Sequence, residues 1–177
     1  MARQEIAAAL ERARAVFTRR PEAAVHDDAP GVARWAGGMR VTCAHPNGKQ
    51  AQTDMPTELG GTGDQVSPGW LLRSGLAACT ATSIAMLAAR EGIELAQLEV
   101  SATSRSDSRG LLGMQDADGR PVYPGPHDLE MRVAITAPGV EPQRLRELVE
   151  KANRLAPMTA VVRDAFPMPL RIVVGGA

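Results

Sequence analysis

The clearest candidate for chemistry is Cys79, which lies in the apolar stretch SPGWLLRSGLAACTATSIAMLAAREG, residues 67–92. A cysteine can act as a nucleophile through its thiolate, or it can pack as a small apolar side chain. Cys79 follows the predicted helix start at Pro68 by eleven residues, so the positive helix N-terminus is too distant to favour the thiolate. A reactive thiol here requires a cation or a hydrogen-bond donor from another segment, and both roles remain open.

The other candidate residues carry no recognisable chemical pattern. Cys43 falls on the apolar face of a predicted strand, which favours packing. His26, His45 and His127 share no metal-ligand spacing, and we expect them to be solvated. The GGTG segment, residues 60–63, lacks the Lys-Ser/Thr that completes a phosphate-binding loop. The sequence thus predicts no metal site and no cofactor, and it contains no recognisable Ser-His-Asp triad.

The composition limits the partners of this chain. Its 177 residues include 20 basic and 20 acidic side chains, and aromatic residues make up only 3%. These values argue against a nucleic acid or an anionic membrane surface as a partner. Two cysteines are too few for a disulfide scaffold, and the charged start of the chain does not resemble a signal peptide. The uncharged run at residues 74–89 is shorter than the roughly 20 residues of a membrane span, so we expect a soluble cytoplasmic protein.

Residues 1–30 are predicted to form an N-terminal amphipathic helix and a linker. Four apolar residues recur at helical spacing in residues 3–19, namely Ile6, Leu10, Ala13 and Phe17. Two prolines and a glycine in residues 19–31 then interrupt this pattern. The main domain is therefore expected to span residues 31–177.

The main domain is predicted to begin with a β-hairpin. Residues 39–44 alternate apolar and polar side chains, as in a strand with one buried face. Asn47-Gly48 is a strong signal for a hairpin turn, because both residues tolerate positive φ. A return strand follows at residues 50–56.

The apolar stretch around Cys79 predicts a long central helix. Ser67 suits an N-cap, Pro68 the first helical position and Gly92 a left-handed C-cap, so the helix should run from Pro68 to Glu91. A helix with so little polar surface must be covered on most sides. Its many small residues would let another backbone come close.

The remaining elements complete an α+β pattern. We expect strands at residues 98–102 and 129–136, an amphipathic helix that Pro142 opens, and a last strand at residues 169–174. Hairpins and helices in this order predict an α+β fold with an antiparallel sheet packed on helices.

Three segments, read together, resemble the OsmC/Ohr family of thiol-dependent hydroperoxide reductases. They are SPGWLLRSGLAACTATSIAMLAAREGIEL, RGLLGMQDADGRPVYPGPHDLEMRVAI and LRELVEKANRLAPMTAVVRDAFPMPLRIVV, and the resemblance covers roughly residues 32–175. It implies an OsmC-like α+β fold in which two copies intertwine as a homodimer, with the long helices between the sheets and the active sites near the interface. The cover that the central helix lacks would then be a second protomer.

The resemblance assigns peroxide attack to Cys79, which matches the cysteine in the AAC segment of the family. The thiolate would attack a peroxide oxygen, release an alcohol or water, and become a sulfenic acid. In the family a second cysteine, in a Cys-Pro dipeptide, then forms a disulfide that a dithiol reductant opens. Here that position is Ala156, so the resemblance implies that the resolving thiol is missing.

A second departure concerns the group that activates the thiol. The family carries a glutamate directly after the proline that opens the central helix, and this glutamate orients an arginine towards the thiolate. Here Gly69 occupies that position. Arg40 and Lys49 lie in the region that supplies the arginine, but neither matches well enough to be assigned.

Two functions follow from these observations. The first is reduction of organic hydroperoxides or hydrogen peroxide through Cys79 alone, with a small external thiol as reductant, in oxidative-stress defence. The alternative is a dimer of the same fold that has lost peroxidase chemistry and binds a small hydrophobic or electrophilic ligand at the interface. The exposure and ionisation of Cys79 would distinguish them.

Overall fold

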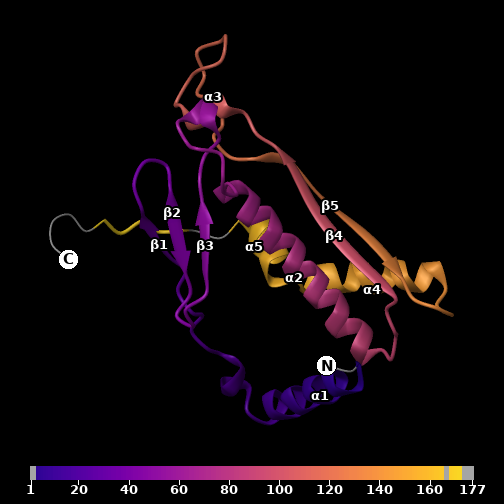
Figure 1. The fold of residues 1–177 in the computed structure, drawn as a ribbon. Helices are drawn as coiled ribbons and strands as arrows, with labels where there is room; N and C mark the ends of the chain where they lie inside the picture. The colour runs from indigo at the N-terminus through magenta and orange to yellow at the C-terminus, as the bar shows by residue number, and fades with distance from the viewer. Residues whose placement is uncertain (1–2, 166–167, 173–177) are drawn as a thin grey trace.

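The long helix predicted around Cys79 is the axis of the fold (Figure 1). The computed structural model describes residues 3–165 and 168–172. Within these residues the helices are α1 (Arg3–Arg19), η1 (Pro21–Ala24), η2 (Thr57–Leu59), α2 (Pro68–Arg90), α3 (Ser108–Leu111), α4 (Pro142–Leu155) and α5 (Pro157–Asp164). The strands are β1 (Val32–Trp35), β2 (Val41–Ala44), β3 (Gln50–Thr53), β4 (Gln97–Arg105) and β5 (His127–Thr136). The prediction of an α+β fold with antiparallel strands and a long helix is confirmed.

The ends of α2 follow the expected capping pattern. The Ser67 hydroxyl accepts a hydrogen bond from the backbone N–H of Trp70 at 3.2 Å, and Pro68 is the first helical residue. Gly92 has a φ of +72°, as a glycine that follows a helix C-terminus requires. The helix ends at Arg90, one residue before the predicted end, because Glu91 is the C-cap.

Among the described residues, the first sheet consists of three antiparallel strands in the order β1-β2-β3. Gly48 has a φ of +85° in the turn between β2 and β3, which confirms the predicted hairpin. The strand expected from residue 39 begins at Val41, because Met39 lies in the turn that connects β1 to β2. Strand β1 was not predicted, because its sequence VARW has no alternation of apolar and polar residues. All four of its residues are exposed in the structure.

The second sheet pairs β4 with β5 and packs on α2, as predicted for both strands. Figure 1 shows the two strands running alongside α2, with α4 and α5 next to the same helix. Side chains from β4 and β5, among them Leu98, Val100, Val133 and Ile135, pack against the core formed by α2 and α4. The most deeply buried core residues are Ile84, Ala88, Leu148 and Ala152. The core therefore lies between the second sheet and these two helices.

The last strand, predicted at residues 169–174, is not formed in the described residues. Residues 169–172 have no regular secondary structure, and Leu170 and Ile172 are 84% and 72% exposed. Residues 173 and 174 lie outside the described part of the chain. A strand requires a neighbouring ladder for its backbone groups, and no described strand of this chain pairs with the segment. The prediction is wrong for residues 169–172.

Helix α2 is long and apolar enough, by length and composition, to cross a membrane. The core helix of a soluble protein passes the same test, and α2 packs on β4, α4, α1 and α5. Only 28% of its most apolar window is buried, however. Trp70, Leu72 and Met86 are each more than 40% exposed. The rest of this chain thus leaves parts of the surface of the central helix uncovered, on the side of Trp70 and on the opposite side of Leu72 and Met86.

Candidate functional site

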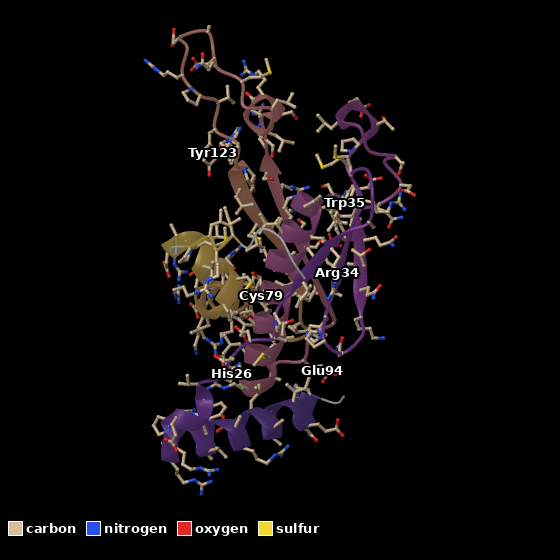
Figure 2. All side chains as sticks on the ribbon, turned by 90° about the vertical axis from the view of Figure 1, so that its left-hand side faces the viewer. His26, Arg34, Trp35, Cys79, Glu94 and Tyr123 are labelled. Carbon is tan, nitrogen blue, oxygen red and sulfur yellow. The ribbon has the colours of Figure 1, made fainter. Side chains whose placement is uncertain are left out.

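Cys79 is half-buried and lines an open pocket of about 960 Å³. Figure 2 shows the residue near the middle of α2. The pocket lies where α1, α2 and the junction between α4 and α5 meet, and we call it the Cys79 pocket. It is lined by Leu10, Ala13, Arg14, Phe17, Thr18, Cys79, Thr82, Ser83, Met86, Leu87, Arg90, Leu155 and Pro157.

The Cys79 pocket has three walls of different origin. Helix α2 supplies Cys79 and the side chains of the next three turns, which follow at helical spacing on one face. Helix α1 supplies Leu10 and Phe17 from its apolar stripe. Leu155 and Pro157 close the side formed by α4 and α5. The lining is mainly apolar, with the hydroxyls of three residues and two arginines as its polar groups.

Ala156, which stands at the resolving position, is fully buried at the junction of α4 and α5. Its neighbours Leu155 and Pro157 both line the pocket that contains Cys79. The buried hydroxyl of Thr80 lies 3.2 Å from the hydroxyl of Thr159, which ties α5 to α2 directly beside Cys79. The structure thus places Ala156, at the predicted resolving position, next to the pocket, although Ala156 itself is not among the lining residues.

Gly69 lies at the start of α2, away from the Cys79 pocket. A Cβ at this position would lie 3.5 Å from a guanidinium nitrogen of Arg73. Arg73 itself donates a hydrogen bond to the hydroxyl of Ser104 on β4, at 3.3 Å. It therefore points to the second sheet, and it is not among the residues that line the pocket with Cys79.

Arg40 belongs to a polar cluster that connects β2 to the loop after β3. Its guanidinium bonds Asp64 and Thr62, and it lies 3.5 Å from the carboxylate of Asp54. Asp54 is 2% exposed and accepts hydrogen bonds from the Thr62 hydroxyl, the Thr62 backbone N–H and the Met55 backbone N–H. The two bonds from Thr62, followed by that from Met55 and the charge of Arg40, lower the pKa of Asp54 to about 2. Arg40 is engaged in this cluster and does not line the Cys79 pocket.

The remaining candidates lie apart from Cys79. Lys49 is exposed in the hairpin between β2 and β3. Cys43, on β2, is half-buried and pairs with residues of β1 and β3, and both cysteines are free thiols. The three histidines are exposed. Across the described residues, no group of three or more His, Cys, Asp or Glu side chains is placed to hold a metal ion.

The sequence analysis missed Arg14 and Arg90, the two cations that line the Cys79 pocket. Arg14 lies on α1, four residues after Leu10 and three before Phe17, so it borders the apolar stripe that was identified. Arg90 directly follows the uncharged run at residues 74–89. The amphipathic pattern of α1 was thus the available signal, but it did not reveal which surface the helix covers.

In chemical terms, the site offers an accessible thiol at the base of an apolar cleft with two guanidinium groups on its lining. A thiol can act on electrophiles or peroxides that enter such a cleft, and the guanidinium groups can bind an anion. In the described residues, the pocket contains no carboxylate or histidine that could act as a general base for the thiol.

Comparisons with known proteins agree with this architecture. A family described as OsmC-like protein matches residues 61–170. A protein named organic hydroperoxide resistance protein, from Xanthomonas axonopodis pv. citri (strain 306), is 26% identical over 123 residues, which are 69% of this chain and 78% of that protein.

Two solved structures extend the likeness to the fold. The crystal structure of an OsmC-like protein from Mycoplasma pneumoniae superposes with a TM-score of 0.64 at 18% identity, over 78% of this chain and 89% of that one. An organic hydroperoxide resistance protein from Elizabethkingia anophelis gives a TM-score of 0.57 at 21% identity, over 78% and 90% of the two chains. These identities are low, so the structural likeness bears on the fold alone.

Proposed function

Because the chain belongs to the OsmC-like family, which its match over residues 61–170 shows, we propose that it reduces hydroperoxides through the thiol of Cys79. The observation that carries this proposal is the half-buried Cys79, which lines an open, mainly apolar pocket. Relatives named organic hydroperoxide resistance proteins support it, with 26% identity over 123 residues. The role would be defence against oxidative stress.

The proposed reaction uses one cysteine of the protein and two molecules of an external thiol. The Cys79 thiolate attacks one oxygen of the peroxide, the O–O bond breaks, and the other oxygen leaves with a proton as an alcohol, or as water from hydrogen peroxide. The resulting sulfenic acid condenses with an external thiol to a mixed disulfide and releases water. A second thiol then attacks the mixed disulfide, which restores Cys79 and releases the oxidised reductant. Ala156 carries no sulfur, so the protein cannot shorten this cycle through a bridge at that position.

A second candidate function is binding without peroxidase turnover. It is favoured by the environment of Cys79, because Arg40 is engaged by Asp54 and Asp64 and Arg73 by Ser104. A dimer that holds a small hydrophobic or electrophilic ligand against Cys79 would need neither a resolving thiol nor an activating cation. The pocket of about 960 Å³ is large enough for a ligand of ordinary size.

Peroxide consumption separates the two functions. We would measure loss of cumene hydroperoxide and of hydrogen peroxide with a monothiol and with a dithiol, for the wild type, Cys79→Ser and Cys43→Ser. The proposal predicts slow consumption that Cys79→Ser abolishes and Cys43→Ser preserves, with the monothiol as effective as the dithiol. Equal rates for the wild type and Cys79→Ser would contradict it and favour the binding function.

We further propose that the protein acts in the cytoplasm as a homodimer, and that its partners are a small peroxide and a small thiol, with no nucleic acid or membrane involved. The balanced charge of the chain supports the last point. The exposed apolar side chains Trp70 and Leu72 on α2 support the dimer.

A further inference from the structure

Helix α1 lies outside residues 61–170, the part of the chain that the family match covers, yet it forms one wall of the Cys79 pocket. Five of the lining residues come from it, and these are Leu10, Ala13, Arg14, Phe17 and Thr18. The helix rests on α2, and Figure 2 shows it passing below the half of α2 that follows Cys79. The pocket of this protein is therefore bounded by an element that the family match does not include.

Contacts at two places hold α1 against the end of α2. The Arg3 guanidinium donates a hydrogen bond to the backbone carbonyl of Gly92. Glu11 forms an ion pair with Arg90 at 3.9 Å. None of the residues Arg3–Arg19 is fully buried, and Phe17 is 43% exposed. The outer wall of the pocket is thus placed by polar contacts near its rim, while its apolar side chains remain available to a ligand.

The polar groups of the pocket give it a positive character. Arg14 and Arg90 line it, and the described residues contribute no acidic side chain to the lining, although Glu11 at the rim pairs with Arg90. Arg14 forms no hydrogen bond or ion pair with any other described residue. A guanidinium that borders an apolar cleft without a protein partner is available to bind a carboxylate or another anion.

The pocket extends along α2 from Cys79 to Arg90. Eleven residues separate them on α2, which corresponds to about 16 Å along the helix axis. The apolar side chains of Met86 and Leu87 lie between these two ends on the same helix. A ligand that lies along this pocket can place an apolar body beside these side chains and a negatively charged group at a distance from the thiol.

We propose that α1 selects the molecules that reach Cys79, and that it favours apolar molecules carrying a negative charge. Leu10 and Phe17 would contact the apolar body, and Arg14 would bind the anionic group, because Arg90 is already paired with Glu11. This inference rests on the proposed function only in placing the reactive end of the ligand at Cys79. It assigns to α1 a role in substrate choice, and Arg14 and Phe17 are the residues that determine it.

The test measures how well small amphiphiles protect Cys79 from alkylation. The full-length protein is treated with iodoacetamide in the presence of octanoate, 1-octanol or octylamine, which share a chain length and differ in charge. Mass spectrometry follows the labelling of Cys79, and Cys43 on the first sheet is the internal reference. We expect octanoate to slow labelling of Cys79 the most and to leave Cys43 unaffected.

Two variants and a matched control assign the effect to α1. Arg14→Gln should weaken protection by octanoate about fivefold, as expected for a solvent-accessible charge pair, and leave protection by 1-octanol unchanged. Phe17→Ala should weaken protection by all three compounds. Arg12→Gln removes an equal charge from an exposed position of the same helix that does not line the pocket, and it should have no effect. Circular dichroism and the unfolding midpoint of each variant verify the fold.

Each contrary result overturns a stated part of the inference. Equal protection by octanoate and 1-octanol that Arg14→Gln leaves unchanged would refute the selection of anions. Protection that Phe17→Ala does not alter would refute α1 as a wall of the site. Failure of peroxide turnover with intact protection would instead contradict the proposed function and leave the inference on α1 standing.

Discussion

At the scale of single residues, the proposed chemistry of Cys79 depends on what stands at positions 156 and 69. Ala156 is buried beside the Cys79 pocket and supplies no sulfur to resolve a sulfenic acid. Gly69 faces Arg73, and Arg73 bonds Ser104 on the second sheet. In the proposed reaction Cys79 therefore has no partner thiol at position 156, and the cations that line its pocket are Arg14 and Arg90 in place of Arg40 or Arg73.

The first prediction concerns the product that peroxide forms on Cys79. Since Cys43 lies on β2 of the first sheet and does not line the pocket, we expect sulfenic or sulfinic acid on Cys79 and no Cys43–Cys79 disulfide. Peptide mass spectrometry after mild peroxide treatment, with a dimedone trap for sulfenic acid, measures this. A quantitative crosslink between the two cysteines would establish a two-cysteine mechanism.

The second prediction concerns restoration of the missing groups. We expect Ala156→Cys to change peroxide turnover by less than about tenfold, because the thiolate still lacks an oriented cation. Adding Gly69→Glu should not increase turnover further, since the new carboxylate would lie near Arg73, an i,i+4 pair worth about 0.2–0.5 kcal/mol of helix stability. Steady-state rates of the wild type, both single variants and the double variant measure the effect. A large gain in the double variant would show that an arginine does reach Cys79.

Part of this site could be predicted from the sequence. Cys79 and Ala156 were identified because their segments resemble those of the family, and Gly69, identified in the same way, lies away from the pocket. Arg14 was not identified, because its role depends on where α1 packs, and the periodicity of a helix gives its buried face but not the surface that the face meets. The same limit applies to Arg40, whose guanidinium is engaged by residues more than ten positions further along the chain.

At the scale of elements, the loop between β3 and α2 is held by the cluster of Arg40, Asp54, Thr62 and Asp64. Asp54 is buried and accepts hydrogen bonds from two segments of this loop. Gly61 lies so close to the Met55 backbone carbonyl that a Cβ would be only 1.8 Å from its oxygen. The loop is therefore closely packed around Asp54, and it delivers the chain to the N-cap of α2.

The third prediction is a pH dependence of stability that originates at Asp54. Its pKa of about 2 lies below the ordinary value of 3.8, so its ionised form stabilises the fold fully above pH 3.8, and this contribution is lost as the pH falls towards 2. Asp54→Asn should lower the unfolding midpoint at neutral pH and flatten its decline between about pH 4 and pH 2. Thermal unfolding followed by circular dichroism across this range measures both effects.

The control for this prediction is Asp118→Asn, which changes a carboxylate whose side chain is 72% exposed. It should leave the midpoint and its pH dependence almost unchanged. A variant Asp54→Asn that unfolds with the same pH profile as the wild type would show that the cluster contributes nothing to stability in acid.

The elements that could be predicted were those with a complete local signal. The ends of α2 are marked by Ser67, Pro68 and Gly92, and the hairpin turn by Asn47-Gly48. Strand β1 has no alternation, since both of its faces are exposed in this chain. Residues 169–172 have the alternation of a strand, but no described strand pairs with them. Alternation shows that a segment could form a strand, whereas its formation also requires a neighbouring strand.

At the scale of the whole molecule, two surfaces lack a partner in this chain. The first sheet makes no extended packing contact with any helix among the described residues, although one face of a sheet is normally buried. The first half of α2 carries the exposed side chains Trp70 and Leu72. Exposed apolar surface of this kind is unusual on a monomer, and a second copy of the chain would cover both surfaces.

The fourth prediction is an obligate dimer in which the α2 helices approach closely. A side chain at Gly75 would meet nothing within 4 Å in the protomer, so Gly75→Leu should not disturb the protomer itself but should block close contact with a second helix. We expect the wild type to sediment as a dimer at micromolar concentration and Gly75→Leu to dissociate. Ala15→Leu, at an exposed position of α1, is the control. A folded wild-type monomer of 18.7 kDa would contradict the prediction.

The linker between α1 and β1 makes the docking of α1 independent of the protein concentration. Residues 20–31 are all exposed, so they tether α1 to the domain without fixing it through packing. A short tether of this kind holds its two ends at an effective concentration on the order of millimolar, whatever the protein concentration. Docking of α1 is then intramolecular, whereas association of two chains follows mass action. Dilution should therefore separate the protomers before it removes α1 from the thiol, and a synthetic α1 peptide added to a truncated chain would bind only at concentrations near that effective value.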